Sequence, residues 1–299
     1  MAVYKHSYRG YEGALTPAWS RFLILPRYAF EAMRRSRFWT MFFLVTLIYP
    51  LVCALIIYIE HNISALKLLN AGRGDLITIN SQFFLNFLGW QSMMAFFLAA
   101  FIGPGQISPD LANNALPLYL ARPFSRVEYV LGKMSVLLIL MSLMTWVPGF
   151  LLFALQAYEE GKGWFGQNIG IASAMFLGAW IYMLLIALLA LALSAWVKWK
   201  PMAGALLFGV FFVAAGFGGI INLILRTRWG SLLSMSNLIG SVWVSLFNRP
   251  VQRGSGAVFF RVGNTEEIPV WCCWMALLAI CAFCLYLLSR KIRGAEVVR

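Results

Sequence analysis

The sequence predicts an all-α membrane protein in which a single domain, residues 1–299, crosses the bilayer with six helices. Hydrophobic residues make up 61% of the chain and charged residues 12%, whereas a soluble domain carries about 25% charged residues. Several apolar runs reach the roughly 20 residues that a helix needs to cross a bilayer. Because lipid offers no hydrogen-bond partners to a free backbone, these runs are expected to be helices.

The net charge of +13 has a simple explanation in such a chain. Basic residues of membrane proteins collect on the cytoplasmic side, so we expect no nucleic-acid partner. The cysteines all fall in predicted spans, and we interpret them as small packing residues rather than metal or redox groups. They are Cys53, Cys272, Cys273, Cys281 and Cys284.

The first 37 residues are predicted to form a cytoplasmic tail and a surface helix. Thr16 and Pro17 are a suitable N-cap and first helical residue. From Arg21 to Arg37 apolar and basic residues separate onto two faces, with a bend expected at Pro26. Such an amphipathic helix is typical of a segment that lies along the membrane. The alternative is a plain basic flank of the first span.

Six apolar runs follow. They are 38–59, 83–103, 130–155, 169–197, 202–225 and 269–288. Pro50 should kink the first span, and Pro148 with Gly149 should break the outer half of the third.

The distribution of basic residues predicts the orientation. With both termini inside, the cytoplasmic segments hold 16 Lys and Arg and the outer segments hold eight. This bias favours cytoplasmic termini, in agreement with an even number of spans.

The outer loop 226–268 contains an apolar stretch, 231–247, that is short and rich in Ser and Asn. We interpret it as a re-entrant element before the sixth span, since re-entrant backbone is allowed where protein or a water-filled cavity surrounds it. A seventh span is the alternative, and it would place the carboxy terminus outside.

The loop between the second and third spans, residues 104–130, is long and structured. Ser108, Pro109 and Asp110 resemble a helix start, with an N-cap, a proline in the first turn and an acid near the positive helix end. This short helix is expected to run to about Leu116, before Pro117. A structured loop with charges of both signs suits docking to a soluble protein.

A second helix start follows in the same loop. Ser125 and Glu128 fit a capping box, so a new helix should begin there and enter the membrane as the third span.

Several chemistries have no counterpart in the sequence. The phosphate-binding pattern GxxxxGK[ST] does not occur, so we expect no ATP hydrolysis by this chain itself. The spans hold almost no charged residues, and His6 and His61 are isolated, which disfavours a proton relay, a metal site or an embedded enzyme. We therefore expect a protein that is not an enzyme and has no cofactor of its own.

The loop resembles one family closely. Asp110, the run 115–126 (ALPLYLARPFSR), Tyr129 and Gly132-Lys133 are similar to the cytoplasmic loop of ABC-2 permeases, the membrane subunits of one class of ATP-binding-cassette exporters. The resemblance implies a multi-pass protein of a prokaryotic cytoplasmic membrane. It implies two permease copies, identical or related, docked on a dimer of cytoplasmic ATPase subunits that bind ATP and Mg. Alternating access driven by that ATPase would move the substrate.

The resemblance also implies roles for individual residues. The loop would be the coupling loop, and the residues that transmit motion would be Asp110, Asn113, Asn114, Tyr119, Arg122 and Arg126. The family's second and fifth spans commonly line the path, so Asn86, Gln91 and Phe212 are weak candidates for substrate contact.

Three alternatives stay open. Arg122, Arg126 and Lys133 could anchor the loop to anionic lipid headgroups instead. The polar residues of the spans could serve only for hydrogen bonds between helices. The whole chain could be a membrane scaffold or sensor that docks an ATPase without transporting anything.

Overall fold

The computed structural model describes residues 20, 24–62, 78–113, 115, 125–161, 163–197, 199–248 and 268–292. Within these ranges the chain is helical and contains no strand. Six of its apolar segments are long enough to cross a membrane, which confirms the predicted fold class. They are α2 (Arg37–His61), α4 (Ser81–Ile102), α7 with α8 (Arg126–Met144 and Trp146–Glu160), α9 (Trp164–Trp196), α10 (Lys200–Leu225) and α12 (Val270–Lys291).

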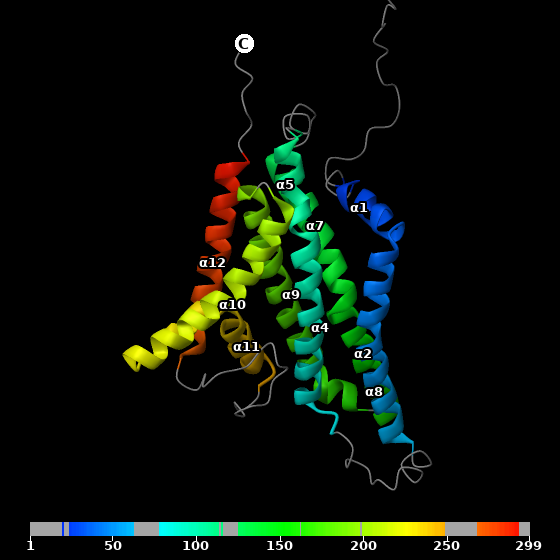
Figure 1. Cartoon of the computed structure of the whole chain (residues 1–299). Coiled ribbons are helices and arrows are strands. Elements are labelled where there is room, and N and C mark those ends of the chain that lie inside the picture. The colour runs from blue at the N-terminus through cyan, green and yellow to red at the C-terminus, as the bar shows by residue number, and fades with distance from the viewer. Residues whose placement is uncertain are drawn as a thin grey trace, which may run out of the picture.

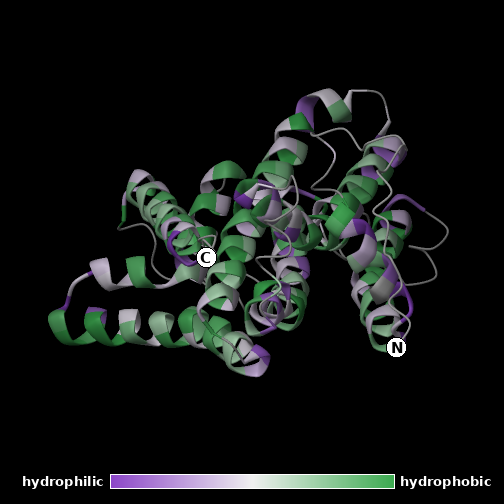
Figure 2. Cartoon of the chain, turned by 90° about the horizontal axis from the view of Figure 1, so that it is seen from above, coloured by the Kyte–Doolittle hydropathy of each residue, from purple (hydrophilic) through white to green (hydrophobic). Residues whose placement is uncertain are grey.

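Helix α9 is the centre of the bundle. It contacts α4, α5, α7, α8, α10, α11 and α12 (Figure 1). From Tyr182 to Ala192 every residue except Leu184 is buried, as expected for a helix that is apolar on every face. The peripheral helices α2, α10 and α12 instead expose many large apolar side chains. Figure 2 shows hydrophobic residues along most of the length of the helices. In a membrane such surfaces face lipid or another protein.

The two ends of the bundle differ. Helix α1 (Ile24–Arg34), the short helix α5 (Pro104–Ala112) and the last turn of α12 lie at one end, called the α5 end below (Figure 1). The first and last described helices therefore finish on the same side, as an even number of spans requires.

Helix α11 (Met235–Leu246) lies in the other half of the bundle, after the 3-10 turn η2 (Trp229–Leu233). Its 12 residues extend only about 18 Å, too little to cross a bilayer. It packs against α9, α10 and α12, and the Trp243 indole N–H donates to the Gly178 carbonyl at 2.9 Å. A seventh span is thereby ruled out for this stretch, and a short element buried among spans replaces it.

The third span breaks earlier than predicted. The interruption lies at Thr145, between α7 and α8, rather than at Pro148 and Gly149. A proline removes the hydrogen bond to the carbonyl four residues before it, here Met144, so the disturbance falls one turn toward the amino terminus. The Met141 carbonyl near the end of α7 accepts from both the backbone N–H and the hydroxyl of Thr145, at 2.9 and 2.8 Å.

Pro50 lies inside α2, as predicted, and the bundle compensates for it. Proline cannot donate to the Thr46 carbonyl, which would otherwise remain unpaired in an apolar setting. The Gln91 side-chain amide of α4 donates to this carbonyl at 3.2 Å. The polar contact thus joins α2 to α4 at the point where α2 lacks a backbone bond.

Helix α1 begins at Ile24, so Pro26 lies in its first turn, where proline is tolerated. Ala29 and Phe30 pack against the core, and Tyr28 is exposed. The predicted start at Thr16 and Pro17 lies outside the described residues, and the position of α1 along the membrane surface stays a prediction.

Helix α5 as candidate functional site

Helix α5 continues almost directly from α4. Gly103 joins them in a helical conformation, and Pro104 occupies the first position of α5. The predicted start at Ser108 is therefore wrong: Ser108 and Pro109 lie inside the helix. Pro104 is itself well suited to the first position, because the N–H that it lacks would have had no partner there. The helix ends at Ala112, short of the predicted Leu116, which lies outside the described residues.

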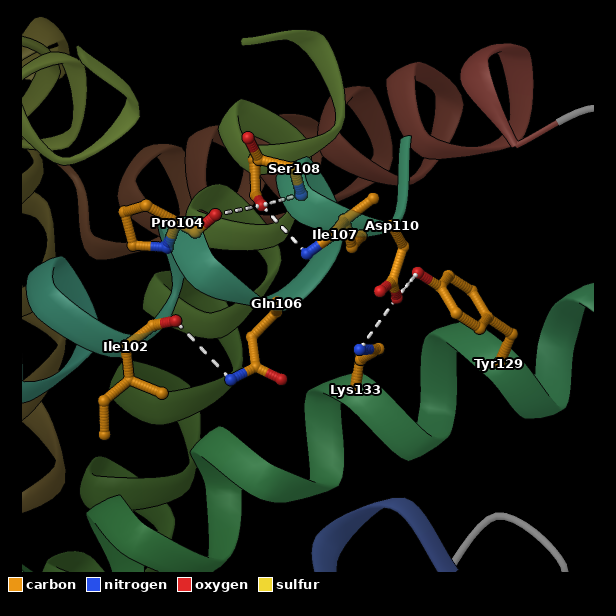
Figure 3. A network of polar contacts seen from close by, with 9 residues as sticks. Ile102, Pro104, Gln106, Ile107, Ser108, Asp110, Tyr129 and Lys133 are labelled. Carbon is orange, nitrogen blue, oxygen red and sulfur yellow. Dashed lines mark hydrogen bonds and ion pairs between the residues drawn. The ribbon is translucent and has the colours of Figure 1, made fainter. Parts of the chain in front are cut away.

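The hydroxyl of Ser194 on α9 anchors the buried side of α5 (Figure 3). It accepts from the backbone N–H groups of Ile107 and Ser108, both at 3.0 Å. It donates to the carbonyl of Pro104 at 2.8 Å. Both serines are fully buried, so these backbone groups have no access to water. One side chain of the central span thus satisfies three backbone groups of the short helix.

The junction of α4 and α5 lies very close to α9. A Cβ at Gly103 would stand 2.5 Å from the Ala99 carbonyl oxygen and 2.7 Å from the Ala190 Cβ. Only glycine fits such a contact without moving a helix. The start of α5 is therefore packed directly against the Ala190 side chain of the central span.

A second anchor joins α5 to α7. The Asp110 carboxylate accepts from the Tyr129 hydroxyl at 2.7 Å and forms an ion pair with the Lys133 ammonium at 2.9 Å (Figure 3). Tyr129 is fully buried, and the charged side chains are only 17% and 13% exposed. Tyr129 and Lys133 are four residues apart, so they lie on one face of α7. Removing either charge would leave the other largely desolvated and without its ion-pair partner.

The start of α7 confirms the predicted capping box. The Ser125 hydroxyl accepts from the Glu128 N–H at 3.2 Å, and the Glu128 carboxylate accepts from the Ser125 N–H at 2.6 Å. The helix that holds Tyr129 and Lys133 therefore has a fixed first turn.

The predicted coupling residues fall into three groups. Asp110 points inward to α7. Asn113 at the end of α5 and Arg126 in the first turn of α7 are exposed. Asn114, Tyr119 and Arg122 lie outside the described residues.

The predicted candidates for the substrate path lie in different surroundings. Gln91 is buried and bonded to α2, and Asn86 accepts from Gln82 of its own helix at 3.0 Å. Phe212 is 46% exposed and stacks on Phe208. These three side chains do not form one site.

Three anchor residues were not among the predicted coupling residues: Tyr129, Lys133 and Ser194. Tyr129 and Lys133 belong to the motif, and Lys133 was considered only as an alternative anchor to lipid headgroups. Lys133 ends the Gly-Lys pair, and its spacing from Tyr129 is a usable signal. Ser194 lies 86 residues from Ser108, and its only signal is a lone hydroxyl in a run of Leu and Ala.

Within the described ranges no three His, Cys, Asp or Glu side chains gather in a way that would hold a metal ion. What the site provides is a short helix with one exposed end, fixed to α9 by a buried hydroxyl and to α7 by a shielded ion pair.

The model of a family described as "ABC-2 family transporter protein" matches residues 29–241, more than two thirds of the chain. No curated protein matches the sequence. The family match starts in α1 and ends in α11, so it includes all of α5 and both of its anchors.

Proposed function

The chain belongs to the ABC-2 family of transporter proteins and is a multi-pass membrane subunit, and from that premise we propose that it is the permease of an ATP-binding-cassette exporter. In this proposal two permeases, identical or related, dock on a pair of cytoplasmic ATPase subunits. ATP and Mg bind to those subunits and not to this chain. The α5 end faces the cytoplasm of a prokaryotic cell, in keeping with the bias of basic residues.

The observation that supports this function best is the double anchoring of α5. A helix that served only as a connector would need few contacts, since helix connections in bundles are commonly about 2–8 residues long. Here the buried side of α5 is bonded to α9 and α7, while Ala112 and Asn113 at its far end are exposed. This combination suits a helix that an ATPase subunit contacts at its exposed end and whose displacement is passed on to α9 and α7.

The anchors suggest how such a push would spread. Displacement of α5 would act on α9 through Ser194 and on α7 through Asp110 and Lys133. Because α9 contacts most of the other helices, its displacement would reach the whole bundle. Packed interfaces shift between discrete arrangements rather than deforming continuously, as alternating access requires.

We expect different defects from changing the exposed residue Arg126 and from changing the internal ion pair of Asp110 and Lys133. We expect Arg126→Glu to weaken copurification with the ATPase, because Arg126 is exposed beside the proposed docking face. We expect the double variant Asp110→Asn/Lys133→Met to keep ATPase binding but to lose stimulation of ATP hydrolysis and vesicle transport, because its lesion is internal. Arg290→Glu, at the end of α12, is the matched surface control.

The outcomes separate the possibilities. If both Arg126→Glu and Asp110→Asn/Lys133→Met bind the ATPase and stimulate it normally, the docking assignment is contradicted. ATPase binding by the parent chain without ATP-dependent transport in vesicles would favour a scaffold or sensor over a permease.

A further inference from the structure

A cavity of about 750 Å³ lies between α1 and α7 at the α5 end of the bundle. Its apolar wall is formed by Pro26 and Phe30 of α1 and by Ile139 of α7. Arg27 and Arg34 line its polar side. The volume is within the range of about 300–1,000 Å³ that small-molecule sites usually have.

The charges around this cavity are unbalanced. Glu31 and Arg35 pair with each other at 2.6 Å, four residues apart, and so largely cancel. Arg27 and Arg34 are seven residues apart, two turns along the same face of α1. In the part of the chain that the structure describes, no carboxylate forms an ion pair with either of them. The polar side of the cavity therefore has an excess of two positive charges.

The cavity also extends from the charged residues of α1 toward the apolar middle of α7. Ile139 lies 13 residues into α7, which corresponds to about 20 Å along that helix from its start at Arg126. Helix α1 directly precedes the first span, so we expect its arginines to lie where the headgroup region meets the hydrocarbon. A ligand that fits must be anionic at one end and apolar at the other.

We propose that this cavity binds one anionic phospholipid from the adjacent membrane leaflet, with its phosphate on Arg27 and Arg34 and an acyl chain against Phe30 and Ile139. A free anion would leave the apolar wall uncovered, and a zwitterionic lipid would leave the excess positive charge unbalanced. Basic pockets beside transmembrane helices are known to select anionic headgroups. The inference concerns a ligand site only and does not depend on the transport proposal.

The test uses the full chain purified in mild detergent and incubated with equal amounts of phosphatidylglycerol and phosphatidylcholine. Native mass spectrometry then counts the lipids that each chain keeps. We expect the parent chain to keep one phosphatidylglycerol in preference to phosphatidylcholine. Since each basic residue near a headgroup contributes about 1 kcal/mol, Arg27→Gln/Arg34→Gln should bind it about thirtyfold more weakly.

Two further variants separate a built site from general surface charge. Arg290→Gln/Lys291→Gln removes the same charge from α12 at the same end of the bundle and should keep the lipid. Ile139→Trp places a larger side chain in the apolar part of the cavity without changing any charge. This variant should lose the lipid, as the arginine variant does. Unchanged thermal unfolding and elution volume of each variant would show that folding is intact.

Three results would overturn the proposal. Equal lipid loss in the α12 control would indicate nonspecific attraction, and displacement of the lipid by inorganic phosphate alone would indicate a small-anion site. Full lipid retention by Arg27→Gln/Arg34→Gln, combined with loss of ATPase copurification, would assign this face to a protein partner instead.

Discussion

At the scale of single residues, the Ser194 hydroxyl has the largest structural consequence. It is the polar partner of three backbone groups that are closed off from water. We expect Ser194→Ala to lower the free energy of unfolding by about 1–3 kcal/mol, because the buried Ile107 N–H at the start of α5 loses the Ser194 oxygen that accepts from it. Thermal unfolding in mild detergent measures the effect.

Ser173 provides the control on the same helix. Its hydroxyl is exposed and donates only to the Gly170 carbonyl one turn earlier. Ser173→Ala should therefore leave the unfolding temperature nearly unchanged. If the two substitutions lower the unfolding temperature equally, the hydrogen bonds of Ser194 to α5 do not contribute to stability.

Gln91 allows a second test, because its side chain bonds to the Thr46 carbonyl, which Pro50 leaves without a backbone donor. We expect Gln91→Leu to destabilise the bundle by about 1 kcal/mol, the usual net value of one hydrogen bond. In a Pro50→Ala background the alanine N–H can donate to the Thr46 carbonyl, so the same substitution should cost much less. Unfolding temperatures of the two single variants and the double variant measure this coupling.

If Gln91 instead contacts the substrate, the pattern differs. Gln91→Leu would then reduce transport equally in the parent chain and in the Pro50→Ala background, while its effect on stability would be the same in both.

At the scale of elements, the carboxy-terminal end of α10 shows how the turn η2 is held against a helix. The Gly230 N–H donates to the Asn222 side-chain oxygen at 2.8 Å, and the Asn222 amide donates to the Ser231 hydroxyl at 2.8 Å. A Cβ on Gly218 would collide with the Gly230 backbone. The turn η2 can therefore lie on α10 only because both contact positions are glycine.

We expect Gly218→Ala to cost about 1–3 kcal/mol through this forced separation. The neighbouring Gly219 faces open space, so Gly219→Ala should be neutral or stabilise α10 by up to about 1 kcal/mol. Thermal unfolding of the two variants, one residue apart, compares them directly. Equal destabilisation would show that α10 and η2 are not packed in this way.

The same scale shows where sequence reasoning succeeded. The capping box of Ser125 and Glu128 was predictable because its partners are three residues apart. The start of α5 was mispredicted because Ser108 looks like an N-cap locally, whereas its N–H bonds to Ser194 on another helix. Contacts between distant segments decided the outcome, and no local pattern describes them.

At the scale of the whole molecule, hydropathy was sufficient for the six spans, since lipid forces every long apolar run into a helix. It was not sufficient for the site. The motif placed Asp110 in the coupling loop, but the inward direction of its carboxylate depends on the packing of α5 against α7. For the same reason α9 could not be recognised as the central helix: its composition resembles that of the lipid-facing spans.

The arrangement of the peripheral helices leads to the last prediction, which concerns a second copy of the chain. Helix α10 projects from the bundle (Figures 1 and 2), and Gly209 and Gly216 on its surface face open space. Exposed glycines let two helices approach closely, which lipid contact does not require. Val213 lies between them on the same face and is 56% exposed. We therefore expect Val213→Cys to form a covalent dimer upon mild oxidation in membranes.

Val45 on α2 is the matched control, because it is the same residue type and is also 56% exposed. Its exposed neighbours, Leu44 and Ile48, are bulky and suit lipid. Val45→Cys should therefore stay monomeric on a denaturing gel, as should the parent chain, whose cysteines lie in α2 and α12. Dimers of Val45→Cys but not of Val213→Cys would show that two copies meet through α2 rather than α10. A path between the two copies would then be lined by α2 and its neighbours.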